Sequence, residues 1–323
     1  MKNRELPLVT IGIPTFNRSK YLKQALESAL NQTYLNIEVI VSDNASTDDT
    51  QEIMKQYLSN PKIKYLRQKE NIGIPANWNV CLNNANGKYF LLLSDDDILE
   101  REAVKILIEK FEDKRVVMSY CNHTIINGNG DPIEEINKKF NPKELESGNK
   151  FILKRFKGKS GGTPSSELFI TEILRRHGGY PNEPQGAADM AAELILATEG
   201  FVAYDKRKLI RYRVHKANNV KNISLMNDSI MGLYLWIEKE DKLKLYKDQM
   251  RSYCAKRFYY YLRNRLLRGV KSDDTFKAIE YLKKMSYFKY KELFIFDSKV
   301  VRKLAQLRRK IRSKLGLPTS GED

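Results

Sequence analysis

The sequence has 323 residues, 41% of them hydrophobic, so the chain can bury one large core or one core with a smaller appendage. Its formal net charge is +17, but the first two thirds are nearly neutral and show no zinc-finger, RRM or KH signature, which argues against a nucleic-acid-binding protein. No stretch has the roughly 18 to 20 uncharged apolar residues that a membrane span needs.

The chain shows no sign of export or of disulfide chemistry. The N-terminus turns into a strand pattern where a signal peptide would have its apolar core and small-residue cleavage site. The three cysteines, Cys81, Cys121 and Cys254, are odd in number and far apart, which is typical of reduced packing residues. We therefore expect a cytoplasmic protein.

The first hundred residues alternate strand and helix patterns. Apolar runs predict the strands, and apolar residues at three- and four-residue steps predict the helices. The expected order is strand 8–16, helix 19–32, strand 37–43, helix 51–58, strand 63–68, helix 78–86 and strand 88–94. This order indicates an α/β fold, in which helices cover both faces of a mostly parallel sheet.

Three polar loops lie at the carboxyl ends of these strands, in residues 14–18, 42–50 and 94–97. Ligands of parallel sheets bind beyond the carboxyl ends of the strands, so the three loops are expected to line one crevice. Asp48, Asp49 and Thr50 can instead cap the helix that follows them. Asp43 comes directly off its strand, where no cap is needed, and is therefore a candidate binding residue.

The third loop holds three consecutive carboxylates, Asp95, Asp96 and Asp97. Adjacent carboxylates repel one another, and a divalent cation relieves that repulsion while keeping them ionised. Mg²⁺ and Mn²⁺ prefer oxygen ligands and leave positions open for phosphate oxygens, so we expect a metal–diphosphate site. Successive side chains near a strand end point to opposite faces, so the three cannot all bind one ion. An acidic turn that caps the helix near residue 100 is the alternative.

Beyond residue 100 the pattern is mixed and includes a predicted strand pair over residues 201–205 and 208–215, and the last hundred residues are basic. Residues 216–323 contain 26 Lys and Arg against 12 Asp and Glu, and residues 298–317 contain eight basic residues and no acidic one. An apolar stripe at three- and four-residue steps predicts an amphipathic helix over residues 298–315. Such a helix could lie on an anionic membrane surface, contact nucleic acid or pack on its own domain.

Six segments occur in the order and spacing of one known family: PTFNR, SDNASTDDT, NIGIPANWN, NGKYFLLLSDDDIL, HGGYPNEPQGAADM and YRVHKANN. The sequence resembles the family 2 nucleotide-sugar glycosyltransferases of the GT-A fold over roughly residues 7–220. The resemblance implies a GT-A domain over residues 1–220, with a nucleotide-binding half (1–100) and an acceptor-side half (101–220). Residues 221–323 lie outside it and are expected to form a basic α-helical extension, a possible membrane-association region.

The resemblance also implies a nucleotide-sugar pocket. The residues that match it are Pro14, Thr15, Asn17, Asp43, Gly73, Asn77 and Asp95. Those of the first-strand loop would line the nucleoside, and the two after residue 70 would close over the base and ribose. Asp43 matches the acid that pairs with a uracil-type base, and Asp95 would reach the ribose or a phosphate.

The metal ligands follow from the same resemblance. Ser94 stands in the place of the first aspartate of the family's Asp-x-Asp motif. Asp96 would then be the principal metal ligand and Asp97 a second carboxylate. His215 matches a histidine that in some relatives reaches the metal or the diphosphate, with a structural histidine satisfied by backbone contacts as the alternative. The cofactor expected is Mn²⁺ or Mg²⁺.

A catalytic base is needed to remove the proton of an attacking alcohol. Asp189 matches an aspartate that the family carries at a helix start, and Ala188 replaces the Glu that commonly precedes it. The alternative for Asp189 is an N-terminal helix residue favoured by the helix dipole. Glu183 and Glu193 are the other candidate bases.

These features together predict an inverting, metal-dependent glycosyltransferase of the hexosyltransferase type. It would move a single sugar from a nucleotide-sugar donor, expected to be a UDP-sugar, to an acceptor hydroxyl in cell-surface polysaccharide or glycan synthesis. The expected partners are that donor, a glycan or lipid-linked acceptor and the cytoplasmic face of the membrane, with no nucleic acid. The alternatives are a non-catalytic sugar-nucleotide- or nucleic-acid-binding protein and a nucleotidyltransferase, although the first loop lacks the glycine-rich phosphate loop of the latter.

Overall fold

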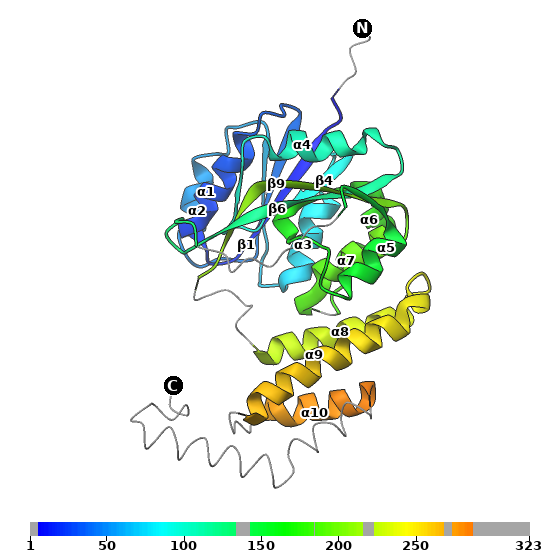
Figure 1. Cartoon of the computed structure of the whole chain (residues 1–323). Helices are drawn as coiled ribbons and strands as arrows, with labels where there is room; N and C mark the ends of the chain where they lie inside the picture. Colours follow the sequence, from blue (N-terminus) through cyan, green and yellow to red (C-terminus); the bar gives the residue numbers. More distant parts are fainter. Residues whose placement is uncertain (1–5, 134–142, 184, 216–222, 268–272, 287–323) are drawn as a thin grey trace. The chain divides into compact units, whose positions relative to one another are not determined.

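The computed structural model describes residues 6–133, 143–183, 185–215, 223–267 and 273–286 of the chain (Figure 1). The chain divides into two compact units, with the boundary between Asn218 and Asn219. The first unit is an α/β domain, and the described residues of the second form helices.

A mixed sheet forms the centre of the first unit. Among the described residues its strand order is β3-β2-β1-β4-β8-β6-β9-β5, and β7 pairs with β9 off this path. The strands are β1 (Val9–Thr15), β2 (Ile37–Asp43), β3 (Ile63–Arg67), β4 (Tyr89–Leu92), β5 (Ile98–Leu99), β6 (Val116–Ile126), β7 (Leu145–Ser147), β8 (Glu167–Ile170) and β9 (Phe201–Arg213). The pairs β1–β2, β2–β3, β1–β4 and β6–β9 are parallel, whereas β5, β7 and β8 run antiparallel to their neighbours.

Helices pack on both faces of this sheet, as Figure 1 shows. They are α1 (Ser19–Leu30), α2 (Thr50–Lys55), α3 (Ile74–Asn83), α4 (Ala103–Glu109), α5 (Gly148–Arg155), α6 (Thr171–Arg176) and α7 (Ala188–Ala197). On one face Leu22 of α1 is buried in the same cluster as Ile11 of β1. On the other face α3 comes so close that a Cβ on Gly12 would lie 2.7 Å from Cβ of Cys81. The α/β fold expected from the sequence is thus confirmed.

Strand β9 differs from the expectation. The sequence pattern predicts two strands, over residues 201–205 and 208–215, but β9 is continuous and pairs in parallel with β6 through a register shift near Asn122. The bulge takes up the polar residues between the two apolar runs, so the ladder continues across them. Because β6 and β9 run parallel to β4, β9 brings Arg213 and then His215 to the edge of the sheet where β1, β2 and β4 end.

In the described part of the second unit, helices pack around an apolar interior. Among the described residues these helices are α8 (Ile223–Lys239), α9 (Lys247–Leu267) and α10 (Asp273–Met285). Its buried side chains include Leu233, Ile237, Met250, Phe258 and Leu282. Arg251 Nε of α9 donates to the carbonyl of Met285 at 2.9 Å, which joins α9 to the end of α10.

The amphipathic helix expected over residues 298–315 lies outside the described part of the chain. Within the described part, no helix combines the length and the apolar composition needed to cross a membrane.

Candidate active site

The first two polar loops bind each other at the carboxyl edge of the sheet. Pro14 and Thr15 end β1, and the carbonyl of Thr15 accepts a hydrogen bond from the N–H of Asn44 at 2.9 Å. Asn17 follows in the left-handed region, with φ of 53°. Its Oδ1 accepts from the N–H of Thr47 at 2.7 Å, so hydrogen bonds join the two loops into one wall.

Asp48 has the capping role that the sequence left open. Its Oδ2 accepts from the N–H of Ser19, the first residue of α1, at 2.8 Å. Its Oδ1 accepts from the N–H of Thr50, the first residue of α2, at 3.1 Å. One carboxylate therefore satisfies donors at two helix starts, which accounts for its position in the loop.

Asp43 lies fully buried at the end of β2. Its Oδ2 accepts from Arg67 Nη1 at 2.6 Å and from the Tyr65 hydroxyl at 2.7 Å, and its Oδ1 accepts from the N–H of Ser46 at 2.8 Å. Burial by itself would raise the pKa of the Asp43 carboxyl, but these hydrogen bonds bring the pKa below its ordinary value. Asp43 is therefore ionised near neutral pH and can accept hydrogen bonds only.

Gly73 and Asn77 lie at the start of α3 but in different surroundings. Gly73 has φ of 86°, and no heavy atom lies within 4 Å of the position that a Cβ would take. The side chain of Asn77 is 3% exposed, and Ser42 of β2 occupies both of its polar groups. Asn77 Nδ2 donates to the Ser42 carbonyl at 3.0 Å, and the Ser42 hydroxyl donates to Asn77 Oδ1 at 2.6 Å. Asn77 thus attaches α3 to β2, while Gly73 borders open space.

The three aspartates follow β4 in a turn, closed by a hydrogen bond from the N–H of Asp97 to the carbonyl of Ser94 at 3.1 Å. Asp95 and Asp96 share one cation, since Arg18 Nη1 lies 2.9 Å from Asp95 Oδ1 and 3.0 Å from Asp96 Oδ2. Burial raises the pKa of Asp95 to about 6, although the Arg18 charge opposes the rise. The conformation of the turn, and not the alternation of side chains along a strand, therefore determines the direction of each aspartate side chain.

Asp97 has hydrogen-bond partners different from those of the other two carboxylates. Its Oδ2 accepts from the hydroxyl of Ser165, and its Oδ1 accepts from the backbone N–H of Arg213 at 2.8 Å. Burial and the neighbouring charge of Asp96 raise the pKa of Asp97 to about 7. These contacts give Asp97 a structural task, because they attach the β4 loop to the end of β9 and to the segment that precedes β8.

Arg213 is a site residue that the sequence analysis missed. It is 1% exposed, and its Nε donates to the backbone carbonyl of Asp96 at 2.7 Å. Its Nη2 donates to Gln24 Oε1 at 2.7 Å, and its guanidinium lies 4.8 Å from the centre of the Tyr21 ring. The signal in the sequence was a charged residue at an inward-facing strand position two residues before His215.

The surroundings of Asp96 fit a divalent cation. Asp96 Oδ2 and His215 Nε2 lie 3.0 Å apart, and this oxygen–nitrogen donor pair suits Mn²⁺. Asp95 and Asp96 are 3% and 5% exposed, and Arg18 brings one positive charge to two carboxylates. Among the described residues, no group of three or more His, Cys, Asp or Glu side chains is arranged to hold a metal. An ion bound here would complete its coordination with diphosphate oxygens or water.

Asp189 lies half-buried in the first turn of α7, where its Oδ1 accepts from the N–H of Met190 at 2.8 Å. Burial raises the pKa of Asp189, and the charge of Glu193 adds to the rise. Of the two other candidate bases, Glu183 is exposed, whereas Glu193 is fully buried and paired with Arg155.

The hydroxyl of Tyr212 in β9 is influenced by charges from both the aspartate turn and the start of α7. Burial raises the pKa of its hydroxyl to about 12, and the charges of Asp97, Asp96 and Asp189 contribute to the rise. The hydroxyl therefore lies within electrostatic reach of both the aspartate turn and the start of α7. The charges of Asp96, Asp97 and Asp189 thus all act on one hydroxyl.

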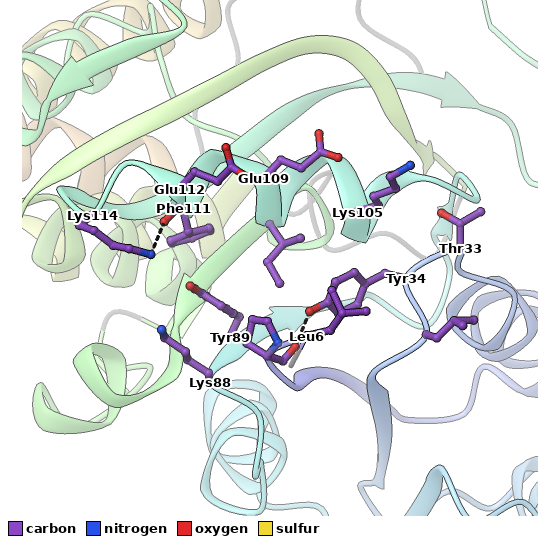
Figure 2. Close-up of a pocket in the computed structure, with 13 residues that line it drawn as sticks. Leu6, Thr33, Tyr34, Lys88, Tyr89, Lys105, Glu109, Phe111, Glu112 and Lys114 are labelled. Carbon is purple, nitrogen blue, oxygen red and sulfur yellow. Dashed lines mark hydrogen bonds between the residues drawn. The ribbon is translucent and has the colours of Figure 1, made fainter. Parts of the chain in front are cut away.

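A separate cavity of about 630 Å³ lies at the opposite edge of the sheet, beside the starts of β1 and β4 (Figure 2). Its apolar wall includes Leu6, Tyr89 and Phe111, and Lys105 and Glu109 of α4 lie at its border. None of the residues that line it belongs to the polar loops, so it is distinct from the candidate active site.

Comparison with known sequences identifies the family. The model of "Glycosyl transferase family 2" matches residues 10–176, just over half of the chain. An uncharacterised glycosyltransferase of Rickettsia typhi is 30% identical over 220 residues, which cover 67% of both chains. Chondroitin synthase of Escherichia coli is 37% identical over 132 residues, which cover 40% of this chain and 19% of that protein. The chain therefore spans about a fifth or less of the synthases it matches.

Comparison with solved structures supports the same fold. Residues 1–349 of Staphylococcus aureus TarS in complex with UDP-GlcNAc superpose with a TM-score of 0.67 at 18% identity, covering 86% of this chain and 80% of that one. The mannosyltransferase PcManGT of Pyrobaculum calidifontis, in complex with GDP-Man and Mn²⁺, gives a TM-score of 0.59 at 16% identity, covering 94% and 84%. The arrangement of polar loops on a GT-A sheet and the sequence match agree: the chain is a glycosyltransferase of family 2.

Proposed function

We propose that this family 2 enzyme is an inverting, metal-dependent transferase that moves one sugar from a UDP-linked donor to an acceptor hydroxyl. What supports the proposal is a set of three chemical groups: the first two lie at the carboxyl edge of the sheet, and the charge of the third acts on the same Tyr212 hydroxyl as that of Asp96. They are the ionised Asp43, the Asp96–His215 pair and Asp189. Each suits one part of a nucleotide-sugar: the base, the diphosphate and the sugar carbon under attack.

The nucleoside would bind in the wall formed by the first two loops. An ionised Asp43 accepts hydrogen bonds only, so it suits the N–H donor of a uracil base. Pro14, Thr15 and Asn17 border the same wall, and the open space above Gly73 leaves room for the base and ribose. The UDP-GlcNAc complex of TarS supports a UDP-linked donor.

The diphosphate would bind next to the aspartate turn. Asp96 and His215 would hold the divalent cation, which supplies the positive charge that neutralises the leaving diphosphate. The Arg18 guanidinium, whose side chain is 27% exposed, adds positive charge at the same place. Asp95 would contact the ribose or a phosphate, and Asp97 would hold β9 in position below them. The Mn²⁺ complex of PcManGT supports a metal-dependent reaction.

Asp189 would act as the base. It takes the proton of the acceptor hydroxyl while that oxygen forms a bond to the anomeric carbon and the bond from this carbon to the diphosphate breaks. A single displacement of this kind inverts the anomeric centre and needs no covalent sugar–enzyme intermediate. The raised pKa of Asp189 makes it a stronger proton acceptor than an ordinary aspartate.

The acceptor would be a glycan or a lipid-linked sugar. The match to chondroitin and hyaluronan synthases supports a role in polysaccharide synthesis. We place the enzyme at the cytoplasmic face of the membrane, because residues 216–323 carry 26 basic against 12 acidic residues and can bind anionic lipid.

The proposal predicts that Asp189→Asn retains donor binding but loses transfer by roughly a factor of 10² to 10⁴, because the amide cannot accept the proton. Donor affinity would be measured by calorimetry, and turnover by UDP release across UDP-, GDP- and dTDP-sugars with Mn²⁺ or Mg²⁺. Glu183→Gln is the matched control, since Glu183 is an exposed carboxylate in the same segment. The absence of metal-dependent stabilisation by every donor would contradict the proposal, as would wild-type turnover by Asp189→Asn.

A further inference from the structure

A buried carboxylate, Glu193, lies one helical turn after Asp189, and the proposed reaction does not use it. Residues four apart share one face of a helix, so the two carboxylates are neighbours on α7. Glu193 is fully buried, and a buried charge requires a partner. Arg155 at the end of α5 is that partner. Its Nε donates to Glu193 Oε2, and its Nη2 donates to Glu193 Oε1 at 3.1 Å.

Glu167 of β8 adds a second carboxyl group to this pair. It is 1% exposed, its carboxyl is hydrogen-bonded to that of Glu193, and it accepts from the N–H of Gly162 at 3.1 Å. A hydrogen bond between two carboxyl groups requires a proton on one of them. Burial raises the pKa of Glu167 well above its ordinary value, and the Glu193 charge raises it further. Glu167 is therefore the protonated member, and Glu193 is the one that forms the ion pair with Arg155.

Two glycines pack against the group formed by Glu193, Arg155 and Glu167. A Cβ on Gly161, whose φ is +105°, would lie 2.4 Å from Arg155 Nε. A Cβ on Gly162 would lie 2.8 Å from Oε1 of Glu167. The backbone can approach the buried ions this closely only without side chains. The group therefore joins α5, the loop before β8, β8 itself and the helix that carries Asp189.

We propose that Glu193, held by Arg155 and hydrogen-bonded by Glu167, is a positioning residue that keeps the Asp189 carboxylate a strong proton acceptor. The inference rests on the proposed role of Asp189 as the base. The negative charge of Glu193 on the same helix face disfavours the ionised form of Asp189, and the two-point contact with Arg155 fixes where that charge lies. Arg155 and the N–H of Met190 act in the opposite direction on the Asp189 pKa, which burial and Glu193 raise.

Apart from the thiol of Cys121, whose pKa burial and the Asp205 and Glu167 charges raise, the other titratable groups that face these carboxylates are phenols. Among the described residues they are Tyr120 of β6, Tyr180 before α7 and Tyr212 of β9. Burial and the neighbouring carboxylates raise the pKa of each hydroxyl, that of Tyr212 to about 12, so all three are neutral near pH 7. Glu193 and Arg155 are thus the charges that decide how basic Asp189 is.

Carboxyl ¹³C NMR of the full chain tests the inference without any assumption about substrate. In protein labelled at the aspartate Cγ, the Asp189 signal is assigned by its loss in Asp189→Asn. We expect Asp189 to titrate well above an ordinary aspartate, and its midpoint to fall by about one pH unit in Glu193→Gln. Glu193→Asp, which keeps the charge, should leave the midpoint raised. The same midpoint in wild type and Glu193→Gln would overturn the inference.

Glu146→Gln is the matched control. Glu146 is a buried carboxylate of β7 that pairs with Lys154, the residue next to Arg155 on α5. Its replacement should lower stability but leave the Asp189 midpoint in place, and an equal fall in this variant would count against a specific role of Glu193. If Glu193→Gln fails to fold, ¹³C labelling of the glutamate Cδ atoms in the wild-type chain provides the test. A Glu193 carboxyl that is protonated at neutral pH would overturn the inference.

Kinetics separate this inference from the proposed function. In Glu193→Gln the acidic limb of the kcat profile should move to lower pH by the shift that NMR measures, while KM for the donor stays constant. If Asp189→Asn retains turnover, the assignment of the base is wrong. If Asp189→Asn abolishes turnover but Glu193→Gln leaves the acidic limb unmoved, the base is right and only the role of Glu193 is refuted.

Discussion

Arg18 contacts two carboxylates of the aspartate turn through a single nitrogen. Its Nη1 lies 3.0 Å from Asp96 Oδ2, and His215 Nε2 lies 3.0 Å from the same oxygen. A metal ligand oxygen that already accepts from a guanidinium is less available to a divalent cation. In the proposed metal site, Arg18 would therefore compete with the metal for Asp96.

Replacement of Arg18 tests both its competition with the metal and its stabilising contact with the two carboxylates. In Arg18→Ala we expect Mn²⁺ to bind roughly tenfold more tightly without nucleotide, because a competing cation is gone. The metal-free protein should lose about 1–3 kcal/mol of stability, because Asp95 and Asp96 lose their partner. Mn²⁺ titration by EPR and thermal unfolding with and without Mn²⁺ measure the two. Arg207→Ala, which removes an ion pair with Asp205 outside the site, is the control. Weaker Mn²⁺ binding in Arg18→Ala would show that Arg18 does not compete.

At the scale of elements, α5 begins directly against the end of α7. The N–H of Gly148 donates to the carbonyl of Gly200 at 2.9 Å. A Cβ on Gly148 would lie 1.5 Å from the carbonyl oxygen of Ala197, so no other residue fits there without displacing the helix. This contact fixes the end of α7 opposite to Asp189, while the Arg155–Glu193 pair fixes its middle.

Gly148→Ala should therefore destabilise the protein by about 3 kcal/mol or more, through overpacking of backbone against backbone. Gly178→Ala is the matched glycine replacement: its φ of +81° adds strain of about 1–2 kcal/mol, but no atom lies within 4 Å of the added Cβ. Equilibrium urea unfolding of the two variants compares the costs. Equal stability would mean that α5 can shift on α7 at little cost.

At the scale of the whole molecule, the charge is divided unevenly along the chain. Residues 1–98 carry 11 basic and 11 acidic residues, whereas residues 298–317 carry eight basic residues and no acidic one. Each Lys or Arg near an anionic bilayer contributes about 1 kcal/mol of attraction, which salt screens. The basic segment can therefore supply most of the affinity for an anionic surface.

Deletion of residues 298–323 should abolish sedimentation with phosphatidylglycerol vesicles, whereas the full chain should sediment with them at low salt and be released as salt rises. Neutral phosphatidylcholine vesicles are the control for the lipid charge. Thermal stabilisation by donor and Mn²⁺ should persist in the truncated chain, since the site lies in the first unit. Unchanged vesicle binding after the deletion would refute the role of this segment.

Local sequence patterns were sufficient to predict the strands and helices that carry the three polar loops. Buried runs such as residues 9–15 and 37–43 are apolar because helices cover both faces of the sheet, so strand, helix and carboxyl-end loops could be read in order. The candidate positions Asp43, Asp96 and Asp189 follow from those loops and from the family motifs. The continuous β9 could not be read in this way, because its polar middle is carried by a bulge against β6.

The sequence by itself determined the fold class, the family and the edge of the sheet where the polar loops meet, because periodicity and motif spacing are local properties. Only the tertiary structure decided which charges are paired. In that structure Asp97 pairs with Ser165 and the end of β9, Asp96 pairs with Arg18 and His215, and Glu193 pairs with Arg155. These partners lie between 38 and 119 positions apart in the chain, so no local pattern records them, and burial makes each pairing necessary.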